Sequence, residues 1–259
     1  MNDPTIAELV DAFEDVLSST VLLARGISDT DAKLATDCPG WTIHDQVSHM
    51  VGLEQVLSGS PRPAISAPDL PHVHGDVGAF MESIVHVRRE LPFGAVVDEL
   101  AGLLPRRVAQ LREAAGAGDP EVMGPMGPRT LSASMPIRVF DLWAHEQDIR
   151  RALGSAPRLD CAAAHVAVAR TLAAWAAVLP AAAGDLNGRL DVTVTGPSAT
   201  TRSYSFGAGG SSARLVGDIG AITWLGCGRG TVAQLGESVT FDGDADVLAA
   251  VGPALGFTP

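Results

Sequence analysis

The chain has 259 residues, of which 18 are Lys or Arg and 30 are Asp or Glu, so its formal net charge is −12 at pH 7. An acidic chain of this kind lacks the positive face that nucleic-acid binding needs, and it is not suited to docking on anionic lipid. Hydrophobic residues make up 46% of the chain and charged residues 19%. So low a share of charged residues excludes a disordered acidic tail, and the apolar residues are enough for the core of one large domain or two modest ones.

The N-terminal residues and the short apolar stretches predict a soluble cytoplasmic protein. Residues 1–15 carry several acids and lack the positive start and apolar stretch of a secretory signal. The longest uncharged hydrophobic stretch, residues 171–184, is too short to span a bilayer. Cys38, Cys161 and Cys227 are odd in number and widely spaced, which predicts neither a disulfide framework nor a CxxC zinc site.

The N-terminal part of the chain reads as helices. Apolar residues recur at helical spacing from Ile6 to Val21. Thr42 stands three residues before Asp45, a pattern that resembles a capping box and predicts a helix to about Leu57. Further helices are predicted over residues 77–89, over residues 93–114, from Ser134 to Gly154 with Pro136 in the first turn, and from Asp160 to Pro180, with loops at residues 60–75 and 116–128.

The pattern changes near Gly184. Residues 190–195 and 203–206 alternate with period two on either side of a Gly-Pro turn signal, and residues 238–241 form a third strand candidate before a last short helix. We therefore predict an α+β protein in which a helical bundle, residues 1–184, precedes a small α+β domain, residues 185–259.

Asp141 and His145 are the most informative pair of polar residues. They are four residues apart, so on a helix their side chains share one face about one turn apart. A carboxylate and an imidazole at this spacing can bind one metal ion without bending the backbone. The alternative is a surface or interface pair in which Asp141 hydrogen-bonds His145. Asp148 nearby is expected to pair with Arg150 or Arg151.

His49, on the helix that Thr42 opens, is a third candidate ligand. If the two helices are neighbours, His49 completes a His–Asp–His set with open positions, as a catalytic metal site requires. The alternative is a core histidine bonded to a backbone carbonyl. Arg229, in the glycine-rich turn Gly226–Gly230, could clamp a substrate carboxylate, or it could be a turn arginine in water.

Two segments of the chain resemble the mycothiol-dependent maleylpyruvate isomerase family of DinB-like metalloproteins. They are Cys38-Pro-Gly-Trp-Thr-Ile-His-Asp-Gln-Val-Ser-His49 and Arg138-Val-Phe-Asp141-Leu-Trp-Ala-His145-Glu-Gln-Asp-Ile-Arg. The resemblance implies a DinB-like helical bundle that binds a divalent metal, usually zinc, followed by a small α+β domain similar to sterol-carrier folds. It also places His49, Asp141 and His145 at the family's three ligand positions. The isomerase itself has Glu where this chain has the shorter Asp141.

The resemblance further implies an enzyme that uses mycothiol as its thiol cofactor. A metal-bound thiolate would add to a small electrophile, which gives cis–trans isomerisation or thiol transfer. Arg229 is then the candidate catalytic residue that grips the substrate or cofactor. The expected partners are a small-molecule thiol and an electrophilic substrate, without nucleic acid or membrane, and the chain fits a monomer or a homodimer equally. Two alternatives stay open: a non-catalytic metal-binding module with a stress-response or interaction role, and a metal-water hydrolase.

Overall fold

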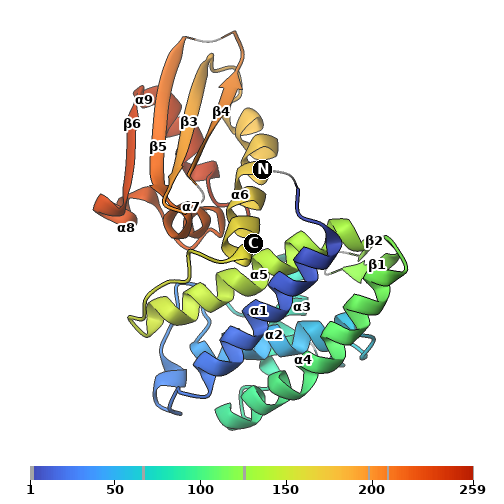
Figure 1. Ribbon diagram of the computed structural model, residues 1–259. Helices are drawn as coiled ribbons and strands as arrows, with labels where there is room; N and C mark the ends of the chain where they lie inside the picture. The colour runs from blue at the N-terminus through green and yellow to red at the C-terminus, as the bar shows by residue number, and fades with distance from the viewer. Residues whose placement is uncertain (1–2, 66–67, 125–126, 198, 209, 259) are drawn as a thin grey trace. The chain divides into compact units, whose positions relative to one another are not determined.

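The chain divides into two compact units, residues 1–156 and residues 157–259 (Figure 1). The first, the helical unit, consists mainly of helices, and the second, the α+β unit, packs helices on a sheet. The computed structural model describes residues 3–65, 68–124, 127–197, 199–208 and 210–258. The predicted α+β fold class is confirmed, whereas the predicted boundary after residue 184 lies one helix too late.

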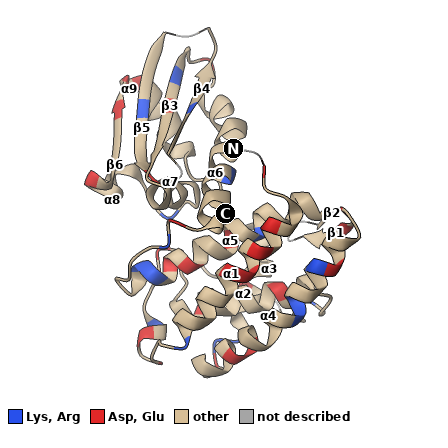
Figure 2. Ribbon diagram, in the orientation of Figure 1, with Lys and Arg blue, Asp and Glu red and all other residues tan. Residues whose placement is uncertain are grey.

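The described part of the helical unit contains α1 (Ile6–Ala24), α2 (Ile43–Leu57), α3 (Gly75–His86), α4 (Phe93–Gly116), α5 (Leu131–Ala152) and a short hairpin of β1 (Glu121–Gly124) and β2 (Gly127–Thr130). α1 packs against α4 and α5, and α2 packs against α3, α4 and α5. Figure 2 shows acidic and basic residues interspersed along these helices. Arg112 on α4, for example, pairs with Asp11 and Glu14 on α1 at the surface.

α2 begins at a capping box, as the sequence predicts. The Thr42 hydroxyl accepts a hydrogen bond from the Asp45 backbone N–H at 3.3 Å, and the Asp45 carboxylate accepts one from the Thr42 backbone N–H at 2.9 Å. Residues on nearly all sides of α2 are buried, so this helix lies at the centre of the unit. A polar side chain such as His49 is therefore held away from solvent on α2.

α5 begins earlier than predicted. Its first residue is Leu131 and its N-cap is Thr130, whereas we predicted a start at Ser134. Pro136 consequently lies inside the helix, where its missing N–H leaves one backbone hydrogen bond unmade. Residues 66–67 and 125–126, which belong to the two predicted loops, lie outside the described residues.

The described part of the α+β unit contains α6 (Ala162–Ala183), β3 (Gly188–Thr195), β4 (Thr200–Phe206), β5 (Ser211–Asp218), α7 (Ile219–Gly226), α8 (Val232–Leu235), β6 (Val239–Gly243) and α9 (Ala245–Val251). The strand order in the sheet is β4-β3-β5-β6. β3 pairs antiparallel with β4 and parallel with β5, and β5 pairs antiparallel with β6. The three predicted strands are present, and β5 and α7 are additional elements that the sequence did not indicate.

α6 belongs to the α+β unit, which corrects the predicted boundary. The Trp175 indole N–H donates to the Leu255 carbonyl at 2.7 Å, and the Tyr204 hydroxyl of β4 donates to the Leu172 carbonyl at 2.8 Å. The change to alternating residues near Gly184 marks the first strand, not the edge of the domain. The helix before it packs on the sheet, so the two form one core.

The ends of α6 also differ from prediction. Its N-cap is Cys161 in place of Asp160, and the helix continues through Pro180 to Ala183. α6 is long and apolar enough to cross a membrane by length and composition alone. Core helices of folded domains have the same composition, and the hydrogen bonds of Trp175 and Leu172 are those of a core helix.

Candidate metal centre

The structure brings the three predicted ligands together inside the helical unit. His49 of α2 meets Asp141 and His145 of α5, and one potential ligand atom from each lies within 4.8 Å of the others. His49 Nε2 is 3.3 Å from Asp141 Oδ2, and His145 Nε2 is 3.6 Å from Asp141 Oδ1. The pairing of α2 with α5 that this arrangement requires is therefore present.

The donor set fits a divalent metal such as zinc. Two imidazoles and one carboxylate form a typical catalytic zinc set, and ligands about 2.0–2.1 Å from a tetrahedral ion lie roughly 3.3 Å apart. The distances of 3.3 Å from His49 Nε2 to Asp141 Oδ2 and of 3.6 Å from His145 Nε2 to Asp141 Oδ1 are close to that value, although they involve different carboxylate oxygens. Burial lowers the pKa of His49, although the Asp141 carboxylate opposes this. The neutral imidazole that metal binding needs is thereby favoured.

Asp141 is held as a carboxylate. Burial alone would raise its pKa, but the Arg138 guanidinium and the neighbouring histidines outweigh burial and hold the pKa well below its usual range. Arg138 Nη1 donates to Asp141 Oδ2 at 3.0 Å. Because Arg138 precedes Asp141 by three residues on α5, one helix face carries both the carboxylate and its countercharge.

His145 has a second carboxylate on its other side. Asp148 Oδ2 lies 3.7 Å from His145 Nδ1, and Gln46 Nε2 donates to Asp148 Oδ2 at 3.4 Å. A carboxylate at this ion-pair distance raises the basicity of the ring, although 3.7 Å is longer than a hydrogen bond. The expected pairing of Asp148 with Arg150 or Arg151 stays a prediction. Arg150 pairs with Glu146, and Arg151 pairs with Asp37.

Trp41 closes one side of the cluster. Its ring centroid lies 5.0 Å from that of His49 and 5.8 Å from that of His145, and the two histidine rings are 4.6 Å apart. Both histidines are buried, whereas 26% of the Asp141 side chain is exposed. A small molecule would therefore reach this cluster from the side of Asp141. This position of Trp41 beside the cluster was not predicted from the sequence.

A chain of buried ion pairs, which we call the charge ladder, connects Arg107, Glu54 and Arg138 to Asp141 of the cluster. Glu54 of α2 is fully buried, and it accepts from Arg107 Nε and from Arg138 Nε, each at 2.7 Å. Arg138 thus joins Glu54 to Asp141. Burial alone would raise the pKa of Glu54, but the two guanidinium groups outweigh burial and lower it. In the sequence, the sign of this ladder is that its charged residues, Glu54, Arg107 and Arg138, lie among the buried apolar residues of their helices.

Arg229 is placed in the α+β unit, on the turn that follows α7. Its backbone N–H donates to the Trp224 carbonyl at 3.2 Å, and its side chain donates to the Cys227 carbonyl at 3.3 Å. The predicted glycine-rich turn is present, with Gly228 at φ +63°. The role of Arg229 in binding substrate stays a prediction.

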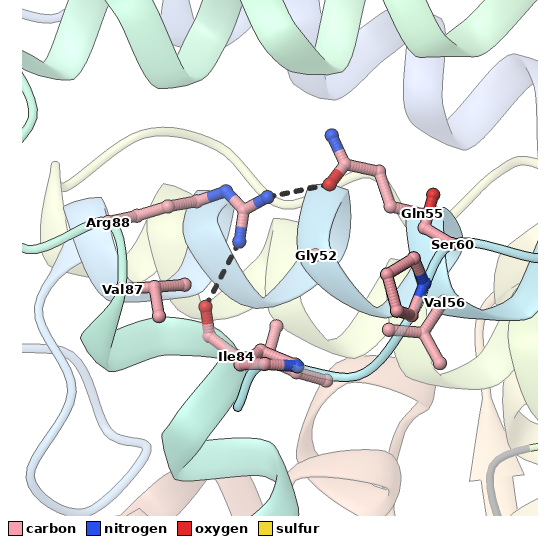
Figure 3. Close-up of a pocket in the computed structure, with 9 residues that line it drawn as sticks. Gly52, Gln55, Val56, Ser60, Ile84, Val87 and Arg88 are labelled. Atoms are coloured by element: carbon pink, nitrogen blue, oxygen red, sulfur yellow. Dashed lines mark hydrogen bonds between the residues drawn. The ribbon is translucent and has the colours of Figure 1, made fainter. Parts of the chain in front are cut away.

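A separate small cavity lies between α2 and α3 (Figure 3). Its volume is about 180 Å³, which is below the range of roughly 300–1,000 Å³ that is usual for ligand pockets. The guanidinium of Arg88 on its wall donates to Gln55 at 2.8 Å, to the Ile84 carbonyl at 3.1 Å and to Glu99 at 3.0 Å. These contacts account for Arg88 as a structural residue of the helical unit.

Comparison with known proteins assigns the family. The sequence model of the mycothiol maleylpyruvate isomerase N-terminal domain matches residues 13–150, which is more than half of the chain and contains all three predicted ligands. No curated protein matches the sequence. Two similar crystal structures are those of the mycothiol-dependent maleylpyruvate isomerase, 20% identical, and of a His-to-Ala mutant of that enzyme, 19% identical. Each comparison covers 93% of this chain and 94% of the other with a TM-score of 0.62, which shows a shared fold. The chain belongs to the family defined by the mycothiol maleylpyruvate isomerase N-terminal domain.

Proposed function

We propose that the protein is a mycothiol-dependent enzyme that isomerises a small electrophilic substrate or transfers a thiol to it, with a divalent metal held by His49, Asp141 and His145. The observation that carries the proposal is the meeting of these side chains within 4.8 Å inside the segment that matches the family. We also propose that it is soluble, cytoplasmic and active on small molecules, in keeping with its net charge of −12.

The chain's own residues prepare this site in three ways. His49 is kept neutral by burial, and Asp141 is kept ionised by Arg138, so both are in the protonation state that binds a metal. The Asp148 carboxylate lies 3.7 Å from His145 Nδ1, where its charge favours a proton on that nitrogen and leaves Nε2 for the metal. When bound, a divalent ion supplies a Lewis acid that lowers the pKa of a thiol, and mycothiol supplies the sulfur that adds to the electrophile.

Arg229 is our candidate for binding a carboxylate of the substrate or a carboxamide of the cofactor. The support is chemical, since a guanidinium offers a planar fork of donors that matches a carboxylate. The turn leaves Arg229 half-buried. We expect Arg229→Ala to lower turnover and to leave the metal content unchanged.

The test combines metal content with thiol-dependent turnover. Purified protein should take up about one zinc ion per chain by elemental analysis, because the described residues offer one such three-ligand set. It should consume maleylpyruvate, or another electrophile of a panel, only with mycothiol and metal present. His145→Ala should lose metal and activity, whereas His86→Ala, which removes an exposed histidine on α3, should keep both.

Other outcomes would point to the other functions. Turnover that continues without thiol would identify a hydrolase. Metal uptake without turnover of any electrophile would identify a binding module. A protein that rejects both zinc and nickel would contradict the proposed site itself.

A further inference from the structure

Trp41 is a buried residue of the helical unit that lies beside the candidate metal centre. Its indole ring lies against both histidines of the candidate metal centre, and its Nε1–H donates to the carboxylate of Glu82 at 3.1 Å. We propose that Trp41, fixed by Glu82, is a positioning residue that holds the rings of His49 and His145 in the orientation that binds metal. This inference rests on the proposed metal site.

The backbone of Trp41 is held by hydrogen bonds of its own, independently of the contacts of its side chain. Its N–H donates to the Cys38 carbonyl at 3.1 Å, and its carbonyl accepts from the backbone N–H and the hydroxyl of Thr36, at 3.0 and 2.9 Å. Gly40 has φ +76°, a conformation that favours glycine. A Cβ at this position would come within 2.1 Å of His72 Nδ1, so the turn also needs glycine for space. The indole therefore projects from a turn whose backbone is held by hydrogen bonds on both sides of the Trp41 peptide.

Glu82 of α3 then fixes the other end of the ring. This buried carboxylate accepts from Trp41, from His72 Nε2 at 3.3 Å and from Arg89. Arg89 also donates to Asp45 of the α2 cap at 2.9 Å. Glu82 is thus held by charged and polar groups from several segments, and the Trp41 N–H bonds to an acceptor that cannot easily move.

The consequence for the histidines is steric. A histidine ring rotates about χ2 over a broad range when nothing packs against it. The indole lies beside both rings, with centroid distances of 5.0 and 5.8 Å, and the ring nitrogens face Asp141 and Asp148 at 3.3 and 3.7 Å. With a smaller or mobile group at position 41, each ring could rotate away from the orientation that binds metal. Metal binding would then have to order the rings, and its affinity would be lower.

The test measures binding of Co²⁺ alone, because its visible absorption reports ligand geometry. Trp41→Phe keeps an aromatic ring and removes the N–H, while Glu82 keeps His72 and Arg89 as partners. We expect about 10-fold weaker Co²⁺ binding and a changed visible spectrum, as is typical when an outer partner of a metal ligand is lost. Trp175→Phe is the matched control, since it loses a buried indole hydrogen bond of 2.7 Å in the α+β unit. It should bind Co²⁺ as the wild type does.

Glu82→Gln provides a second variant if Trp41→Phe does not fold. It keeps the indole but removes the ionic acceptor of all three donors, Trp41, His72 and Arg89. We expect weaker Co²⁺ binding with a changed spectrum. Wild-type affinity and spectrum in a folded Trp41→Phe or Glu82→Gln would overturn the inference, and so would an equal loss in Trp175→Phe. A wild-type protein that binds no Co²⁺ and no zinc would instead overturn the proposed function, so the two failures are distinguishable.

Discussion

Removal of the Glu54 carboxylate tests the buried charge ladder directly. Glu54→Leu leaves Arg138 with Asp141 and Arg107 with Gln110, so two buried guanidinium groups lose the anion between them. Breaking a buried ion pair by removing one partner costs about 3–5 kcal/mol, because a buried charge is left uncompensated. Glu54 is 0% exposed and both arginines are buried, so we expect the free energy of unfolding to fall by an amount in that range.

A second substitution separates the charge from the packing. Glu54→Leu combined with Arg107→Met replaces one buried pair by apolar groups and leaves Arg138 with Asp141. Replacing a whole buried pair in this way is often close to neutral, so we expect recovery to within about 2 kcal/mol of the wild type. Arg112→Met is the surface control. Arg112 is 54% exposed beside its acidic partners, and its loss should cost less than about 1 kcal/mol.

The assay is urea unfolding followed by tryptophan fluorescence. Replacing Trp175 and Trp224 by Phe leaves Trp41 and Trp143, so that the emission reports the helical unit alone. A double-mutant cycle then gives the coupling between Glu54 and Arg107. If the double variant loses the sum of the two single losses, the ladder acts by packing and our electrostatic reasoning is refuted.

Three further predictions concern pH, the turn and the ligand set. Burial raises the pKa of Tyr204 to about 12, so the folded α+β unit retains the proton that the unfolded chain loses above pH 10. As the pH rises from about 10 to about 12, the free energy of unfolding of this unit should therefore decrease by at most about 2 kcal/mol. Tyr204→Phe should remove this decrease in thermal melts recorded at several pH values. Gly40→Ala should cost more than about 1 kcal/mol in urea unfolding, because of its φ of +76° and its closeness to His72. Asp141→Glu should weaken zinc binding measured by chelator competition, since the longer side chain would move its oxygens from their 3.0 Å contact with Arg138; unchanged affinity would contradict this.

The parts of the fold that depend on local chemistry are predictable from sequence. The capping box of Thr42 and Asp45 and the shared face of Asp141 and His145 follow from spacing along one helix, and the structure has both. The meeting of His49 with that pair is not a local property. Nothing in the spacing of residues on α2 fixes which helix packs beside it, and only the family resemblance supplied that expectation.

The parts that were missed depend on contacts between distant segments. β5 pairs in parallel with β3 and is followed directly by α7, so no hairpin signal marks it. The contact of Gln46 with Asp148 joins α2 to α5, and no spacing along either helix predicts it. Trp41 precedes a helix cap, a position where an aromatic residue has no particular meaning until α5 and Glu82 are in place.

Arg138 belongs to both the charge ladder and the candidate metal centre, and this links stability to site geometry. On α5 it precedes Asp141 by one turn, and its partner Glu54 follows His49 by five residues on α2. The ladder therefore fixes the register of α2 against α5 close to where His49 must meet Asp141. The combined Glu54→Leu and Arg107→Met variant restores stability by apolar packing, but it also removes the bond between the helices. We therefore expect it to fold nearly as well as the wild type and still to bind zinc more weakly, because burial alone does not fix the register that the three ligands need.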